Sequence, residues 1–166
     1  FGGDNSQLPE KDTIKSLENR VIELSATDDV AANEQDALAQ YRLYLELAEG
    51  EPENRQEALR RLGDLSLRAG DDALVSESAA GIGQHRDAIR YYEQLLATAG
   101  DYARADHVLY QLARAYESAG DPDAALRTLD QLVEQYPDSR HIDEVQFRRG
   151  EIFFMRKDYA LAGRAY

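Results

Sequence analysis

Three histidines are the side chains best suited to metal or acid–base chemistry, but their spacing does not form a site. His85, His107 and His141 lie 22 and 34 residues apart. Two imidazoles that bind one metal from a single helix are typically four residues apart, which places them on the same face. We therefore expect each of the three to be an ordinary exposed histidine, and we expect no metal site.

Other catalytic groups give no better indication of an enzyme. The 166 residues contain no cysteine, which excludes disulfides, thiolate ligands and cysteine nucleophiles but does not distinguish an oxidising from a reducing compartment. Carboxylates are abundant, yet no pair stands out from the solvated faces of charged helices, and no G-x-S-x-G turn is present. The glycines of "GIG" at residues 81–83 predict a turn, not a phosphate loop, because no GK[ST] follows. The sequence predicts a protein that is not an enzyme and has no cofactor.

The charge of the chain limits its partners. A formal net charge of −13 argues against nucleic-acid binding, because the phosphate backbone repels such a surface. Residues 1–83 hold 18 acidic and 8 basic side chains, which indicates either solubility alone or a basic partner that meets this half. The longest apolar run, Ile152 to Met155, is far shorter than the roughly 18 residues of a membrane span, so no membrane insertion is expected.

A period of 37 residues organises the second half of the chain and must position any functional group there. Alanines, the large residues four positions after them, and small residues of the preceding helices all recur with this spacing. These columns are Ala88, Ala125 and Ala162; Tyr92, Leu129 and Tyr166; and Ala113 and Gly150. A fixed period of this size predicts stacked repeats.

Each repeat unit is expected to be two antiparallel helices. A small residue such as Ala113 lets the two helices approach closely, while Leu109, Leu112 and Tyr116 form an apolar stripe. The segment from Ser118 to Asp121 combines a glycine suited to a left-handed cap with an aspartate suited to begin the next helix. Lys157 to Tyr159 has the same role without a glycine, and Pro137 ends the second helix.

These residues resemble the tetratricopeptide repeat (TPR) family. One unit matches the signature positions of the family, and a second unit matches in part through Gly150, Phe153, Ala162 and Tyr166. The matching positions of the first unit are Leu109, Leu112, Ala113, Tyr116, Ala125, Leu129 and Pro137. The resemblance implies an all-α, right-handed superhelical solenoid of antiparallel helix pairs.

The 37-residue period leaves a long connector between the last two repeat units, and this connector makes the resemblance more specific. It is similar to that of TPR proteins of the Gram-negative periplasm and outer membrane, which implies an envelope location. A cytoplasmic location is the alternative.

The remaining segments complete the expected organisation. Residues 1–34 form a polar segment with one helix or extended piece around Ile14 to Leu24, and residues 35–166 form the repeat array. An insertion near 71–84 either lengthens two helices or forms a loop. The last repeat is incomplete, so we expect the chain to be part of a longer protein and to self-associate through its C-terminal end.

The resemblance places a binding groove on the first helices of successive units. Aromatic and arginine side chains in these columns are suited to anchor a peptide, although aromatics at helical spacing also pack in cores. The groove columns fall on Arg60, Asp64, Leu67, His107, Tyr110, Arg114, Glu117, Phe147, Glu151 and Phe154. The carboxylate clamp of the family, which uses lysines and asparagines, is not reproduced, because these columns hold Asp64, Arg114 and Glu151 in place of asparagine.

The sequence thus favours a non-catalytic scaffold that binds a peptide or protein in its groove. Two alternatives remain open. The segment is purely architectural or oligomerising, or it is an accessory region of an enzyme whose catalytic domain lies elsewhere in the chain.

Overall fold

A computed structural model describes residues 28–47, 52–76 and 80–166, and these residues form helices and turns without a strand. The expected helix or extended piece around Ile14 to Leu24 lies outside the described residues. No helix in the described part of the chain is both long and apolar enough to cross a membrane. The helices are α2 (Asp28–Leu47), α3 (Pro52–Val75), α4 (Gly81–Thr98), α5 (Ala105–Ser118), α6 (Pro122–Gln135), α7 (Ile142–Met155) and α8 (Tyr159–Ala165).

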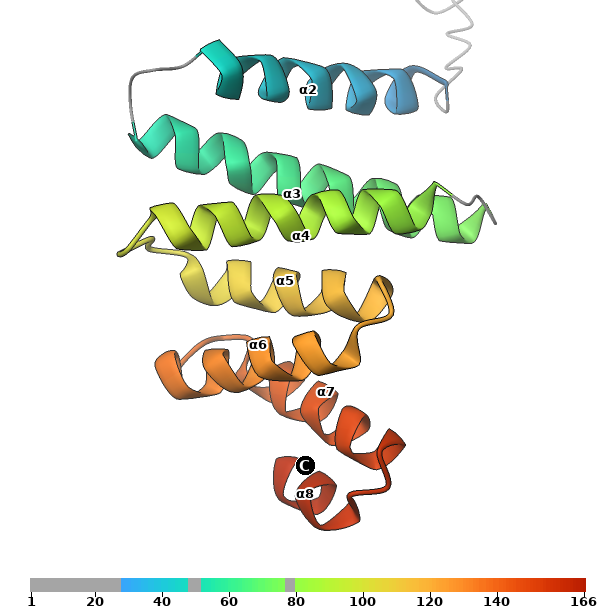
Figure 1. Cartoon of the computed structure of the whole chain (residues 1–166), viewed down its shortest axis with the longest axis vertical. Helices are drawn as coiled ribbons and strands as arrows, with labels where there is room; N and C mark the ends of the chain where they lie inside the picture. The colour runs from blue at the N-terminus through green and yellow to red at the C-terminus, as the bar shows by residue number, and fades with distance from the viewer. Residues whose placement is uncertain (1–27, 48–51, 77–79) are drawn as a thin grey trace, which may run out of the picture.

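The helices stack in chain order along the long axis of the molecule, from α2 at one end to α8 at the other (Figure 1). Each helix packs on the next one, so that α3/α4, α5/α6 and α7/α8 form three successive pairs, and α3 also contacts α5. The predicted all-α solenoid of antiparallel helix pairs is confirmed.

The turns within two of the pairs follow the predicted capping chemistry. Gly120 has a φ of 81°, and the Oδ1 atom of Asp121 accepts a hydrogen bond of 2.9 Å from the backbone N–H of Ala124. In the last pair Lys157 takes the left-handed conformation with a φ of 63°, and Asp158 accepts from the N–H of Leu161. In both turns a residue with a positive φ ends one helix, and an aspartate side chain caps the start of the next helix.

Glycines allow an aromatic ring to lie directly against the opposite helix of a pair. A Cβ atom at Gly63 would lie 2.4 Å from the ring of Tyr92, and one at Gly150 would lie 2.7 Å from the ring of Tyr166. Tyr92 is fully buried, whereas Tyr166 is 62% exposed. The predicted columns of small and large residues are thus the contacts that hold each pair together.

The insertion lengthens the two helices of the first complete pair. Helix α3 continues to Val75 and α4 begins at Gly81, so that both extend past the end of α5 (Figure 1). The turn predicted for "GIG" is wrong, because residues 81–83 form the first turn of α4. Gly81 is buried there, and a Cβ atom would lie 3.0 Å from the carbonyl oxygen of Gly70, so close packing between α3 and α4 explains this glycine.

The apolar interior is continuous along the stack. One cluster of buried side chains joins α2 to α5, and a second joins α5 to α7. Leu96 and Tyr116 pack against both clusters. Each pair therefore buries its apolar face against its neighbours, as stacked repeats require.

Candidate functional site

The first helices of the three pairs, α3, α5 and α7, carry the predicted groove residues. At the α3 end, Arg60 is only 4% exposed and makes ion pairs of 2.5 Å with both Glu57 and Asp64. The hydroxyl of Tyr92 donates a 2.8 Å hydrogen bond to Asp64. Hydrogen bonding to Arg60 lowers the pKa of Glu57 to about 2, even though burial opposes this shift. These groups are engaged with one another and stabilise α3 against α4.

Asp71 connects three helices. Its Oδ1 atom lies 3.0 Å from Nε2 of His85 on α4, and its Oδ2 atom accepts a 3.3 Å hydrogen bond from Arg114 on α5. The prediction that His85 is exposed is wrong, because its side chain is completely buried. The ring lies against Gly70, where a Cβ atom would come within 2.5 Å of it, so the extended α3/α4 pair encloses this histidine.

His107 and His141 meet between α5 and the connector that precedes α7. Nδ1 of His107 lies 3.2 Å from Nε2 of His141, and Nε of Arg140 donates to the same Nε2 at 3.2 Å. Nε2 of His141 therefore carries a lone pair and accepts, and Nδ1 of His107 is the donor in the hydrogen bond between the two histidines. The ring of His141 also stacks on Tyr110, with centroids 4.5 Å apart.

Both histidines are partly buried, so the prediction that they are ordinary exposed side chains is wrong for them as well. Burial lowers the pKa of His107, and the positive charges of Arg104 and Arg140 add to this effect. Burial and Arg140 also lower the pKa of His141. Only two imidazoles meet here, and the described residues contain no group of three or more His, Cys, Asp or Glu side chains that could hold a metal ion.

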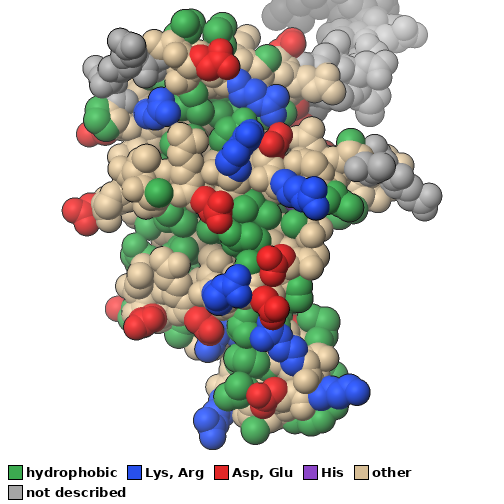
Figure 2. Space-filling view, in the orientation of Figure 1, with side chains coloured by type: hydrophobic (Ala, Val, Ile, Leu, Met, Phe, Trp, Pro, Cys, Tyr) green, Lys and Arg blue, Asp and Glu red, His purple; other side chains and the backbone are tan. Residues whose placement is uncertain are grey.

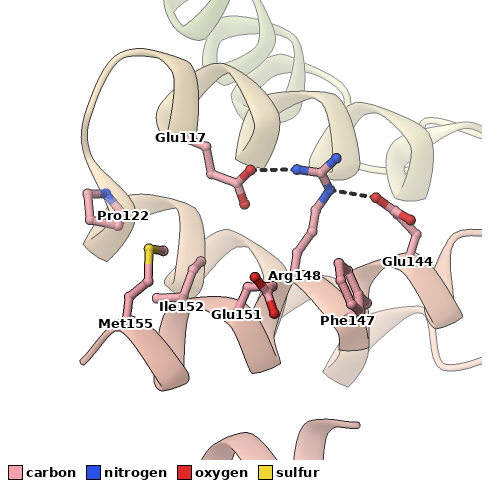
Figure 3. Close-up of a pocket in the computed structure, with 8 residues that line it drawn as sticks. All are labelled: Glu117, Pro122, Glu144, Phe147, Arg148, Glu151, Ile152 and Met155. Carbon is pink, nitrogen blue, oxygen red and sulfur yellow. Dashed lines mark hydrogen bonds and ion pairs between the residues drawn. The ribbon is translucent and has the colours of Figure 1, made fainter. Parts of the chain in front are cut away.

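A pocket of about 370 Å³ lies between α5 and α7, at the point where α6 begins (Figure 3). Arg148 forms one wall and crosses from α7 to α5. Its Nη1 atom donates to Oε2 of Glu117 at 2.6 Å, and its Nε atom lies 3.0 Å from Oε1 of Glu144 in an ion pair. The guanidinium carbon also lies 5.8 Å from the centre of the Tyr110 ring, which continues the contacts of the histidine pair.

The rest of the pocket lining is largely apolar. Ile152 is buried and forms part of the lining together with Pro122, while Phe147 is 52% and Met155 68% exposed. Glu151 lies between them on α7, and its carboxylate accepts a hydrogen bond from the hydroxyl of Tyr166. An apolar surface with a few charged groups at its edge is the usual composition of a binding pocket.

The ten predicted groove residues have three different environments. Leu67 is 3% exposed and belongs to the core, so it offers no surface to a ligand. Side chains in the middle and α3 parts of the face are engaged in contacts within the chain. These are Arg60, Asp64, His107, Tyr110, Arg114 and Glu117. Phe147, Glu151 and Phe154 on α7 are exposed.

Sequence reasoning missed five residues that line the pocket. They lie outside the groove columns of the family pattern and are Pro122, Glu144, Arg148, Ile152 and Met155. The i, i+4 spacing of Glu144 and Arg148 is a readable signal of a helical ion pair. Nothing in the sequence indicates the longer contact between Arg148 and Glu117, because 31 residues separate the two.

The architecture defines the class of protein as a helical-repeat solenoid. Within it, residues 79–146, which include α4, α5 and α6, match the model of the tetratricopeptide repeat family. This match supports the resemblance drawn from the residues, and repeats of this family are typically non-catalytic modules that bind proteins or peptides.

The crystal structure of MamA is similar to the chain with a TM-score of 0.47 and 16% sequence identity, over 80% of this chain and 74% of that chain. A comparison with curated proteins finds no match.

Proposed function

We propose that the chain is a non-catalytic scaffold that binds a peptide or protein along the face formed by α3, α5 and α7. The observation that carries this proposal is the pocket between α5 and α7, with the exposed Phe147 at its edge. Large aromatic side chains at such edges are frequent anchors of protein interfaces. The tetratricopeptide repeat match supports the same kind of function.

The polar groups on the face support binding at this end. Ion pairs connect α3 to α5 and α5 to α7, and the contact between Asp71 and His85 connects α3 to α4. On the side of the stack shown in Figure 2, both basic and acidic side chains occur along its length. Paired charges fix the shape of the face, and a rigid face loses little conformational entropy when a partner binds.

We place this scaffold in a bacterial envelope-associated assembly, in the periplasm or at the outer membrane. The 37-residue period with its long connector supports this location. A cytoplasmic location is the alternative, and the experiment below includes both compartments.

The test is a pull-down with the purified chain, performed separately with an envelope extract and a cytosolic extract of a bacterium. A Phe147→Ala, Phe154→Ala variant removes two exposed aromatics from α7. A Leu47→Ala, Val75→Ala variant is the matched control, because it removes two exposed apolar side chains far from the pocket. Circular dichroism establishes that all three proteins are equally helical.

The proposal predicts a protein that the wild type and the control retain and the α7 variant loses, with enrichment from the envelope extract. Capture from the cytosolic extract alone would refute the envelope location. Equal capture by all three proteins would refute binding at α7 and favour a purely architectural role. A catalytic domain in a longer form of the chain, if one exists, would favour the accessory role.

A further inference from the structure

We infer that the pocket between α5 and α7 selects a peptide segment in which an apolar side chain lies next to a lysine or arginine. This inference rests on the proposed function and specifies the chemistry of the partner. The apolar side chain fills the pocket, and the cation pairs with the carboxylates around it. The three observations that follow carry the inference.

The dimensions of the pocket suit one or two side chains. Its volume of about 370 Å³ is at the small end of the range for ligand sites, which begins at about 300 Å³. Ile152 and Pro122 contribute apolar lining, and Phe147 and Met155 leave apolar surface exposed to solvent. An unbranched or γ-branched apolar side chain would cover this surface and remove it from water.

The charges around the pocket are predominantly negative. Glu117, Glu144 and Glu151 line it with three carboxylates, while Arg148 is its single basic residue. Most of the net negative charge of the chain lies in residues 1–83, so the attraction at this pocket rests on its own three carboxylates. A basic segment is therefore attracted to this end of the face, and an acidic one is repelled.

The carboxylates retain the capacity to accept further hydrogen bonds. Arg148 satisfies Glu117 with a hydrogen bond of 2.6 Å, but its Nε atom makes no hydrogen bond with a described residue, and its contact with Glu144 is an ion pair only. Glu144 is half exposed, with a side-chain exposure of 48%. Figure 3 shows Glu117 and Glu144 on opposite sides of the Arg148 guanidinium. An incoming ammonium or guanidinium group can therefore pair with Glu144 without displacing Arg148 from Glu117.

The test begins with a library of random seven-residue peptides displayed on phage and selected on the immobilised wild-type chain. The enriched sequences are synthesised with a fluorescent label, and their dissociation constants are measured by fluorescence anisotropy. Each sequence is compared with a version in which glutamate replaces every lysine and arginine, and with a version in which serine replaces every apolar residue.

Two pocket variants separate the apolar and the charge contributions. Phe147→Ser, Met155→Ser removes exposed apolar surface, and Glu144→Gln, Glu151→Gln removes two negative charges without changing shape. Their matched controls lie outside the pocket on exposed positions: Leu47→Ser, Val75→Ser for the first and Glu46→Gln, Glu134→Gln for the second.

We expect enrichment of peptides that combine an apolar residue with lysine or arginine. Each pocket variant should bind them at least about tenfold more weakly than its control, which corresponds to a loss of about 1.4 kcal/mol and is within the range for a central interface contact. Raising the salt concentration from about 0.05 M to about 0.5 M should weaken binding to the wild type more than binding to the Glu144→Gln, Glu151→Gln variant, since salt screens exposed charges.

The contrary outcomes distinguish the two proposals. Enrichment of acidic or uncharged peptides, or of basic peptides that bind both pocket variants as tightly as the controls, would refute the inference and leave peptide binding by the scaffold intact. No enrichment, together with no protein captured in the pull-down, would refute the inference and the proposed function together. If light scattering then shows that the wild type is a dimer and the Phe147→Ser, Met155→Ser variant a monomer, the pocket is a contact between two copies of the chain.

Discussion

At the scale of single residues, two different amino acids adopt the same backbone conformation at equivalent turns of two repeats. Gly120 and Lys157 both have positive φ angles, 81° and 63°, at the turn between the helices of a pair. Glycine adopts this conformation at no steric cost, whereas a residue with a Cβ atom is strained there by about 1–2 kcal/mol. The α7/α8 turn is therefore less stable than the α5/α6 turn of the same shape.

Exchanging these residues should change stability in opposite directions. We expect Lys157→Gly to raise the free energy of unfolding by up to about 1 kcal/mol and Gly120→Ala to lower it by about 1 kcal/mol. Urea unfolding followed by circular dichroism measures both. Gly100→Ala is the control, because its backbone is not left-handed and a Cβ atom would meet nothing within 4 Å. A loss of stability in Lys157→Gly would show that the conformation of the turn does not limit the stability of the α7/α8 pair.

Two glycines that face an aromatic ring should differ in their tolerance of a methyl group. Gly63 lies against Tyr92, which is fully buried and hydrogen-bonded to Asp64, so the ring has no space to move. Gly150 lies against Tyr166, which is mostly exposed. We expect Gly63→Ala to cost about 1–3 kcal/mol of unfolding free energy and Gly150→Ala less than about 1 kcal/mol. Urea unfolding measures this order, and similar losses in both variants would contradict it.

At the scale of helices, capping residues and the 37-residue period were sufficient to predict the pairs. Asp121 and Pro137 delimit α6, which spans Pro122–Gln135, as the sequence indicates. The conformation of the insertion, helix extension or loop, was not predictable, because its apolar side chains do not reveal a buried face. Leu74 is 50%, Val75 87% and Ile82 48% exposed, so the projecting ends of α3 and α4 lack the periodic burial by which a helix is recognised.

The candidate site was only partly predictable for a related reason. The groove columns of the family pattern include three residues that line the pocket, Glu117, Phe147 and Glu151. The pattern does not indicate which of the long side chains form pairs with one another across repeats. Arg148 reaches Glu117, and His107 meets His141 across 34 residues, through rotamers that depend on the packed structure.

The histidine pair makes the joint between α5 and α7 sensitive to pH. Both histidines have pKa values below their usual 6.5, so the unfolded chain binds more protons than the folded one as the pH falls through that value. Their contribution to stability is therefore complete above pH 6.5 and is lost below it. Protonation of Nε2 of His141 would also remove its two hydrogen bonds, from His107 and Arg140.

We expect the free energy of unfolding of the wild type to decrease between about pH 7.5 and about pH 5.5. The decrease should be smaller in a His107→Gln, His141→Gln variant, which retains His85. Glu57 and Asp106 have pKa values below their usual 4.5 and 3.8. The stability that these two carboxylates contribute is therefore lost at lower pH than that of the histidine pair. Urea unfolding at a series of pH values is the measurement, and equal slopes for both proteins would exclude the histidine pair as the cause.

At the scale of the whole molecule, exposed apolar side chains gather at the α7/α8 end. Phe154, Tyr159, Leu161 and Tyr166 are between 37% and 62% exposed. We expect the chain to self-associate through this face as its concentration rises. The net charge of −13 opposes the approach of two copies, so association should strengthen with salt.

Multi-angle light scattering over a range of protein and salt concentrations measures this association. A Phe154→Ser, Tyr159→Ser variant should remain a monomer where the wild type associates, and Leu47→Ser, Val75→Ser should behave as the wild type. A strict monomer of the wild type at high concentration and high salt would contradict the expectation.

The packing of each helix mainly on its immediate neighbours has a mechanical consequence. The α7/α8 pair is joined to the rest of the stack through α6, the bond from Arg148 to Glu117 and the histidine pair. It can therefore open locally while α2 to α6 remain intact. A ligand bound between α5 and α7 would connect the α7/α8 pair to the rest of the stack. Occupancy of the pocket would then protect the α7/α8 end from proteolytic cleavage and leave the cleavage rate elsewhere unchanged.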